Sequence, residues 1–164
     1  MLKKVGSAIV SMGILFAMVL TACISVYAEE DKFVDGSYLT YSEYSCGTTS
    51  NAMQKGEHLM DGDSIIAKTG NGKIYTYGET TANHDVDFVA VLVYVDRYHE
   101  DTERWGQIDA RAKDARDTYY VVSTKTLQVD RGYFYRVHCE HFAGNDDEEM
   151  HDSAISATDG IWIP

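Results

Sequence analysis

Three polar side chains near the middle of the chain have the types and spacing needed for acid–base chemistry: His84, Asp85 and Asp87. In an extended segment, residues two apart share a face, so both carboxylates project to one side, with the imidazole beside them. Such a set can hold a cation or act as general acid and base. The same spacing also occurs where a loop enters a strand and all three groups are solvated. If the protein is a small secreted hydrolase, which is the alternative to a binding function, these three residues are its candidate catalytic set.

Two further groups have metal-ligating side chains in an unsuitable arrangement. His138 and His141 are three apart in a strand-like segment, which puts them on opposite faces, where they cannot bind one ion. The acidic run 145–149 lacks the alternating carboxylates of a calcium loop and is expected to be a solvated turn. The sequence has neither a Gly-x-Ser-x-Gly nucleophile motif nor a phosphate-binding glycine loop. We predict no metal and no cofactor, and favour a protein that is not an enzyme.

Aromatic residues are the other candidate for function, because the chain has 12 tyrosines and two tryptophans. Tyrosine and tryptophan offer amphipathic contact area, which suits the recognition of sugars and proteins. Tyrosine also suits half-buried strand faces, and this explains most of the set. The candidate binding residues are Trp105, Tyr98 and Tyr135. Trp105 is expected to be exposed, because it lies beside Gly106 after a charged turn.

Cys46 and Cys139 form an even pair in a chain that is expected to be exported. A disulfide is the default expectation in an oxidising compartment, and it would contribute on the order of 4–5 kcal/mol by closing a long loop. The alternative is two free thiols, one of them buried in a strand.

The N-terminal residues 1–28 have the three parts of an export signal. Lys3 and Lys4 supply the positive charge, an apolar stretch follows, and Ala28 is a small residue at the predicted cleavage site. The competing interpretation is a lipoprotein signal, Leu20-Thr21-Ala22-Cys23, which would anchor the protein at the cell surface through lipid on Cys23. We favour a released, secreted protein.

The chain is strongly acidic, with a formal net charge of −12. Such a surface is repelled by nucleic acid and by anionic lipid head groups. We therefore expect no nucleic-acid partner, and no membrane span after the signal. The expected partner is an extracellular protein or glycan.

The strongest strand prediction is Val86–Tyr98, in which both faces are apolar, as in a central strand covered on both sides. Its expected neighbour is Gly132–Phe142. A type I′ hairpin is predicted at Asn71-Gly72, and a second hairpin is predicted to join 118–129 to 133–142. The segment Arg104–Ile108 is expected to be a strand, followed by irregular chain.

Several short strands with turn signals between them, and no clear helix, predict an all-β fold. We expect a single antiparallel β-sandwich, Ig-like or jelly-roll-like, of about seven to eight strands. It would span residues 37–164, after the signal peptide 1–28 and a flexible acidic lead-in 29–36.

A set of short motifs accompanies the export signal: Leu59-Met60, Gly72-x-Ile74-Tyr75, a Val-rich strand followed by Trp105, Gly132-Tyr133-x-Tyr135-Arg136-Val137 with a later His141, and Thr158-Asp159-Gly160-Ile161. In this combination the chain resembles a family of small exported bacterial proteins known only as a domain of unknown function. The resemblance implies a shared β-domain and secretion. It implies no catalytic residues, because the family has none assigned.

The leading functional prediction is a non-enzymatic extracellular module that binds a protein or glycan. The alternatives are the small hydrolase, and an antagonistic factor that acts on neighbouring cells.

Overall fold

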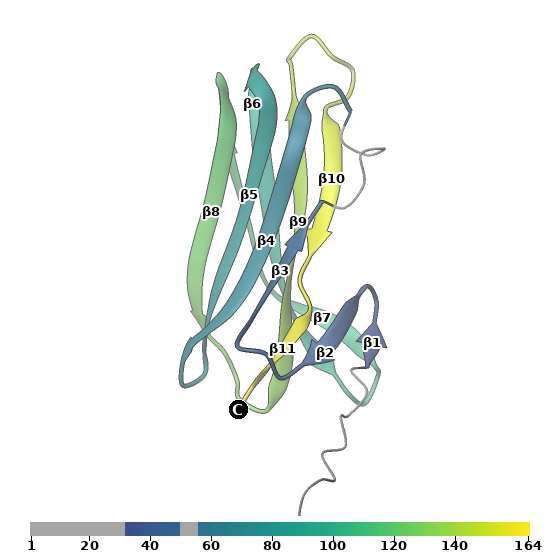
Figure 1. The fold of residues 1–164 in the computed structure, drawn as a ribbon, viewed down its shortest axis with the longest axis vertical. Coiled ribbons are helices and arrows are strands. Elements are labelled where there is room, and N and C mark those ends of the chain that lie inside the picture. The colour runs from purple at the N-terminus through teal and green to yellow at the C-terminus, as the bar shows by residue number, and fades with distance from the viewer. Residues whose placement is uncertain (1–31, 50–55) are drawn as a thin grey trace, which may run out of the picture. The chain divides into compact units, whose positions relative to one another are not determined.

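The computed structural model describes residues 32–49 and 56–164, so the predicted signal peptide lies outside the described residues. These residues form eleven β-strands and no helix, which confirms the all-β prediction and shows that the expected strand count was too low (Figure 1). Within them, nothing helical could cross a membrane. The strands are β1 (Phe33–Val34), β2 (Ser37–Thr40), β3 (Tyr44–Thr48), β4 (Leu59–Gly70), β5 (Lys73–Val86), β6 (Phe88–His99), β7 (Arg104–Ala115), β8 (Thr118–Gln128), β9 (Tyr133–Gly144), β10 (Asp152–Ala157) and β11 (Gly160–Ile163).

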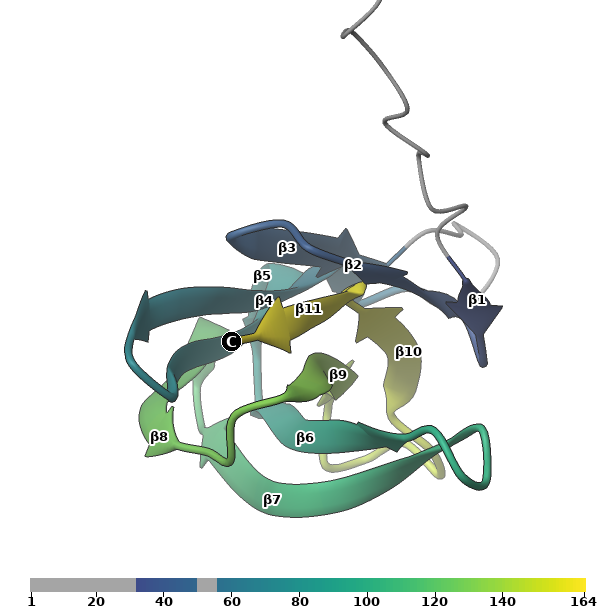
Figure 2. The ribbon, with the colours of Figure 1, turned by 90° about the horizontal axis from the view of Figure 1, so that it is seen from below.

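The strands make two sheets that face each other (Figure 2). The seven-stranded sheet has the order β1-β2-β11-β9-β6-β7, with β10 also paired to β9, and the four-stranded sheet has the order β3-β4-β5-β8. β11 and β10 follow one another along the same edge of β9. All pairs are antiparallel except β2 with β11, which corrects the expectation of a wholly antiparallel fold. Because β1 is paired to β2, the sheet begins inside the predicted lead-in.

β6 is an interior strand of the larger sheet, between the edge strand β7 and β9, and not the central strand expected from the sequence. Its pairing with β9 confirms the expected neighbourhood of the two most β-prone stretches. Burying each valine of its inner face contributes roughly 1.5–3 kcal/mol. The outer face is not fully covered, because Leu92 and Tyr94 are only half-buried. The fully buried inner residues are Val89, Val91, Val93 and Val95.

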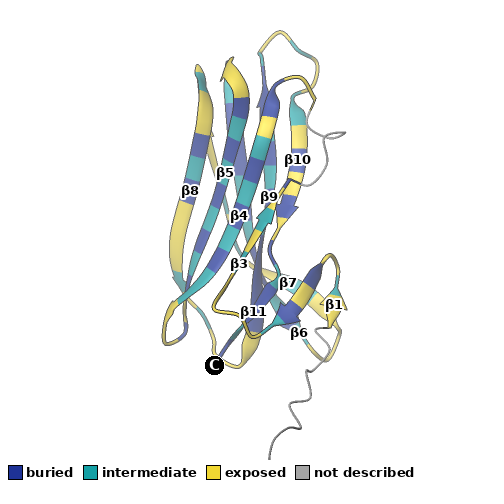
Figure 3. Ribbon diagram, viewed as in Figure 1, coloured by how far each residue is buried: buried dark blue, intermediate teal, exposed yellow. Residues whose placement is uncertain are grey.

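The two sheets come close together at Gly78 in the middle of β5. A Cβ atom at Gly78 would lie 2.6 Å from a methyl of Val93 and 2.7 Å from the sulfur of Cys139. Because glycine has no side chain, β5 can approach β6 and β9 here. Along β4 and β5, buried residues alternate with half-buried ones, as this packing requires (Figure 3).

Three local predictions need correction. β7 is a continuous strand to Ala115, because β6 pairs along its whole length. β8 and β9 do not form a hairpin: β8 pairs with β5 and β9 with β6, so the chain crosses between the sheets at Asp130-Arg131-Gly132. The β4–β5 hairpin is present, but Gly72 has a φ of 62° while Asn71 has no positive φ, so the turn is not type I′.

Cys46 and Cys139 are both free thiols, so the predicted disulfide is wrong. Cys46 is exposed on the outer face of β3, whereas Cys139 is buried between the sheets. Side chains alternate along a strand, and these two positions project in incompatible directions. Burial raises the pKa of the Cys139 thiol to about 12.

His141 occupies the core and is fully buried. The hydroxyl of Thr80 donates to the carbonyl of Ala90 (2.8 Å), so its oxygen accepts from Nδ1 of His141 at 2.9 Å. Nε2 then accepts from the hydroxyl of Ser156 at 2.8 Å. This arrangement holds a neutral imidazole, and burial lowers the pKa of His141 to about 4. His138 lies on the opposite, outer face, as predicted.

Candidate functional site

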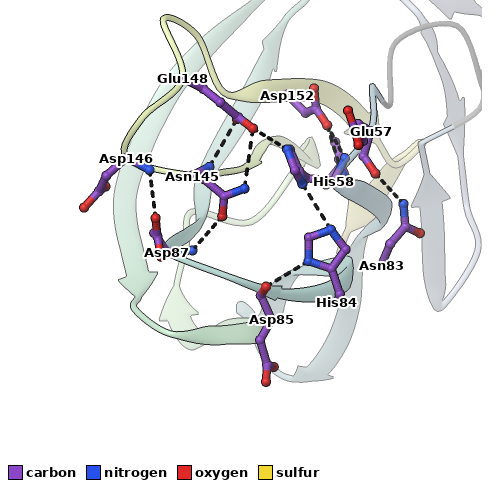
Figure 4. Close-up of polar contacts among 11 residues, drawn as sticks. Glu57, His58, Asn83, His84, Asp85, Asp87, Asn145, Asp146, Glu148 and Asp152 are labelled. Atoms are coloured by element: carbon purple, nitrogen blue, oxygen red, sulfur yellow. Dashed lines mark hydrogen bonds and ion pairs between the residues drawn. The ribbon is translucent and has the colours of Figure 1, made fainter.

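A histidine–acid cluster lies where β4 and β5 meet the loop between β9 and β10 (Figure 4). Nε2 of His58 donates to a carboxylate oxygen of Glu148 at 2.5 Å. Nδ1 of His58 lies 3.2 Å from Nε2 of His84, and Nδ1 of His84 donates to the backbone oxygen of Asp85 at 2.8 Å. His58 is buried and His84 is exposed. The contacts form a chain from a carboxylate through two rings to solvent.

The hydrogens in this chain can be counted. The Glu148 carboxylate and the Asp85 carbonyl only accept, so Nε2 of His58 and Nδ1 of His84 each carry a hydrogen. The contact between the rings requires a third hydrogen, yet two neutral imidazoles carry only two. With both rings neutral, the three contacts therefore cannot all be hydrogen bonds at the same time. The backbone N–H of Asn145, and also His58, lower the pKa of Glu148 and keep it ionised, against the effect of its burial.

The predicted catalytic set is not assembled around a reacting group. Asp85 contributes its backbone oxygen, and its side chain is exposed. The carboxylate of Asp87 accepts from the backbone N–H of Asp146 at 3.0 Å. The carboxylate of Asp152 likewise accepts from the backbone N–H of His58. These carboxylates hold loop backbone, and among the described residues none of the contacts in the cluster is with a hydroxyl or a thiol.

No group of three or more His, Cys, Asp or Glu residues in the described ranges is arranged to hold a metal ion. The cluster positions the β9–β10 loop on β4 and β5.

A second candidate site is a groove of about 410 Å³ between the β6–β7 turn and the start of β9. Its wall combines aromatic rings with charged side chains. Small-ligand sites commonly have volumes of about 300–1,000 Å³, which includes this groove. The lining residues are Arg97, Tyr98, His99, Glu100, Asp101, Gly132, Tyr133, Phe134 and Trp162.

The aromatic wall is held by ring-to-ring packing. The ring centres of Phe134 and Trp162 are 5.0 Å apart, and Tyr41 lies 5.5 Å from Phe134 and 6.1 Å from Trp162. Tyr41 is 59% exposed and Tyr133 39% exposed, whereas Phe134 is buried. Edge-to-face and tilted contacts of this kind fix ring orientation. The groove therefore presents aromatic surface that does not have to be ordered on binding.

The polar wall is held by Arg97. Its guanidinium donates to Asp130 at 3.2 Å and lies 4.7 Å from the centre of the Tyr133 ring. Nε of Arg97 and the hydroxyl of Tyr98 are buried without a hydrogen-bond partner in the part of the chain that the structure describes. Unsatisfied buried polar atoms cost roughly 1–3 kcal/mol each, so they are found where a rearrangement or a ligand can supply a partner.

The three predicted binding residues occupy different positions. Tyr98 lines the groove but is only 2% exposed. Tyr135 is buried, and its hydroxyl donates to the backbone oxygen of Asp130 at 2.8 Å, so it supports the partner of Arg97. Trp105 is half-buried, contrary to the expected exposure.

Trp105 is fixed by two contacts beneath β1. Its indole N–H donates to the backbone oxygen of Val34 at 3.0 Å, and the guanidinium of Arg136 lies 4.5 Å from its ring. Arg136 also donates to Asp96, as does His138. Burial alone would raise the pKa of Asp96, but these two partners lower it below its usual value. The ring of Trp105 also lies 5.4 Å from the ring of Tyr98, so Trp105 supports a residue that lines the groove.

Sequence reasoning missed His58, Glu148, Tyr133, Phe134 and Trp162. Tyr133 and Phe134 lie in the strand-like stretch Gly132–Phe142, in which the sequence pattern singles out only Tyr135 for binding, and Trp162 stands in a short terminal strand. Phe134 and Trp162 are directly paired across β9 and β11, so their side chains share one face of the sheet. Because side chains alternate along a strand, this is the outer face, opposite to Tyr135, but the pairing has to be known first. His58 carried no local motif.

Comparisons with known protein families, with curated proteins and with solved structures find no significant match for this chain. The resemblance to a family of small exported bacterial proteins stays a prediction.

Proposed function

We propose that the chain is a non-enzymatic extracellular binding module whose ligand is a carbohydrate, held in the groove beside the β6–β7 turn. One observation carries the proposal: fixed aromatic rings and hydrogen-bonding side chains line the same groove. A sugar ring has an apolar face, which can stack on Trp162 or Tyr133, and hydroxyls at its rim. Arg97 can donate to those hydroxyls, and Glu100 and Asp101 can accept from them.

The dimensions favour a sugar over a folded protein. A stable protein–protein interface covers about 800 Å² on each partner. A groove of about 410 Å³ suits a ligand of a few rings. A protein ligand, an enzymatic activity and an antagonistic factor are the competing functions. In this proposal the two facing sheets form a sandwich of Ig-like or jelly-roll-like type, and residues 1–28 direct it out of the cell.

The test is a titration of the purified chain with a panel of neutral, amine-bearing and acidic oligosaccharides, followed by calorimetry on the best ligand. We expect saturable binding that Trp162→Ala or Tyr133→Ala weakens by about tenfold or more, since such anchors typically contribute over 1 kcal/mol. Tyr119→Ala is the matched control, because Tyr119 is 54% exposed on β8 in the other sheet.

Circular dichroism of each variant separates a lost contact from a lost fold. Saturable binding that survives both groove variants would reject the groove as the site. Absence of binding to every sugar in the panel would reject the carbohydrate proposal.

A further inference from the structure

We infer that the groove selects sugars that carry a free amine, and discriminates against anionic sugars. This inference rests on the proposed function and concerns the same site. It follows from the charges of the groove and from the partners that those charges already have.

The one arginine of the groove is already paired. Arg97 donates to Asp130, and the ring of Tyr133 covers the guanidinium. Arg104 lies opposite His99 in the β6–β7 ladder but is not part of the groove lining. An anionic sugar would therefore have to compete with Asp130 for the guanidinium of Arg97, the one Arg or Lys side chain in the lining.

The two carboxylates of the groove have no such partner. Glu100 and Asp101 are exposed in the β6–β7 turn, and neither makes an ion pair in the described part of the chain. The neighbouring cation Lys32 is already paired with Glu103 at 2.5 Å. The lining thus carries unpaired negative charge, which attracts an ammonium group and repels a carboxylate or phosphate.

The aromatic side of the groove supports the same selection. The rings around it already accept cations: Arg97 lies over Tyr133, and the Lys32 ammonium lies 5.7 Å from the centre of the Tyr98 ring. An ammonium group near an aromatic face gains a further attraction. Trp162 also lines the groove, and within residues 32–49 and 56–164 its ring contacts are with Tyr41 and Phe134, with no cation over it. A protonated amino sugar can thus contact a carboxylate and a ring in the same groove.

The experiment compares two oligosaccharides that differ only in acetylation: a β-1,4-linked glucosamine tetramer with protonated amines, and its N-acetylated counterpart. Each exposed ion pair contributes about 0.2–1 kcal/mol, so we expect the amine form to bind roughly fivefold more tightly. That preference should shrink as salt is added.

The variant Glu100→Gln/Asp101→Asn should remove the preference while leaving binding of the N-acetylated tetramer unchanged. The control Asp147→Asn/Glu149→Gln removes the same charge from the β9–β10 loop at the other end of β9, and should keep the preference.

Equal binding of both tetramers, or tighter binding of a uronic-acid oligomer, would overturn the amine selectivity and leave the carbohydrate proposal standing. If the preference persists in the turn variant, the assignment to Glu100 and Asp101 is wrong. If no sugar of the panel binds, both proposals fail together.

Discussion

Nδ1 of His58 lies 3.2 Å from Nε2 of His84, and this contact joins the start of β4 to the end of β5. Glu148 on the far side of His58 extends the connection to the β9–β10 loop. The cluster therefore ties three chain segments together at one end of the two sheets. We interpret it as a structural clamp, and the interpretation can be tested.

Removing the buried ring should cost far more stability than removing the exposed one. His58→Ala removes the histidine partner of Glu148 and leaves only its bonds from Asn145, and a hydrogen bond to a charged group contributes about 1.5–3 kcal/mol. We expect a loss of about 2–3 kcal/mol in the free energy of unfolding by urea. His84→Ala should cost less than about 1 kcal/mol, because the ring is exposed. Equal losses would contradict the clamp, and loss of a measured hydrolase activity in His84→Ala would favour the catalytic alternative.

The buried His141 predicts acid sensitivity with a definite pH window. Its pKa is about 6.5 in an unfolded chain and about 4 in the fold, so the unfolded state binds the proton first as pH falls. The stability contributed by the neutral ring is complete above about pH 6.5 and is lost as pH falls toward about 4. The loss should reach about 3 kcal/mol.

Urea unfolding across this pH range measures the effect. His141→Gln keeps a neutral hydrogen-bonding side chain, and should flatten the pH dependence even if its stability at neutral pH is lower. If the free energy of unfolding of this variant falls with pH as steeply as that of the parent chain, a group other than His141 causes the acid sensitivity.

The two thiols should differ sharply in reactivity. Cys46 is exposed and should react with a thiol reagent in the native protein. Cys139 is buried with its pKa raised to about 12, and should react only after unfolding. Mass spectrometry after labelling, with and without denaturant, counts the modified sites. A chain that takes up no label until it is reduced would restore the disulfide.

The contact between the sheets at Gly78 predicts an overpacking effect. Gly78→Ala puts a methyl 2.6 Å from Val93 and 2.7 Å from Cys139, so the sheets must shift. We expect a loss of about 1–3 kcal/mol. Val93→Ala makes room for that methyl, so the double variant should lose less than the sum of the two single losses. Strict additivity in this double-mutant cycle would contradict the contact.

The sequence is most informative where local pattern decides the structure. β6 and β9 could be predicted because each is a long stretch rich in apolar residues. Their pairing was expected because they are the two stretches with the highest β-propensity. β7 could not, since Arg104–Ala115 is polar and alanine-rich, and pairing with β6 overrides its weak propensity. The sequence also could not show that the chain passes from one sheet to the other between β8 and β9. Asp, Arg and Gly residues suit a hairpin turn within one sheet and a connection between two sheets equally well.

The candidate sites were largely invisible for a related reason. His58 and His84 are 26 residues apart, and His58 and Glu148 are 90 apart. Trp162 reaches the groove only because β11 pairs with the start of β9. Such contacts depend on strand order, which no local motif encodes.

The placement of β11 has a consequence for how the chain is made. β11 lies between β2 and β9, so β1 and β2 can pair with each other but cannot join the rest of the larger sheet until β11 is available. During synthesis on a ribosome, which delivers the chain from its N-terminus, the β1–β2 pair must wait for Gly160–Ile163 before it can join β9 through β11. The larger sheet can therefore be completed only after residue 163 has been delivered.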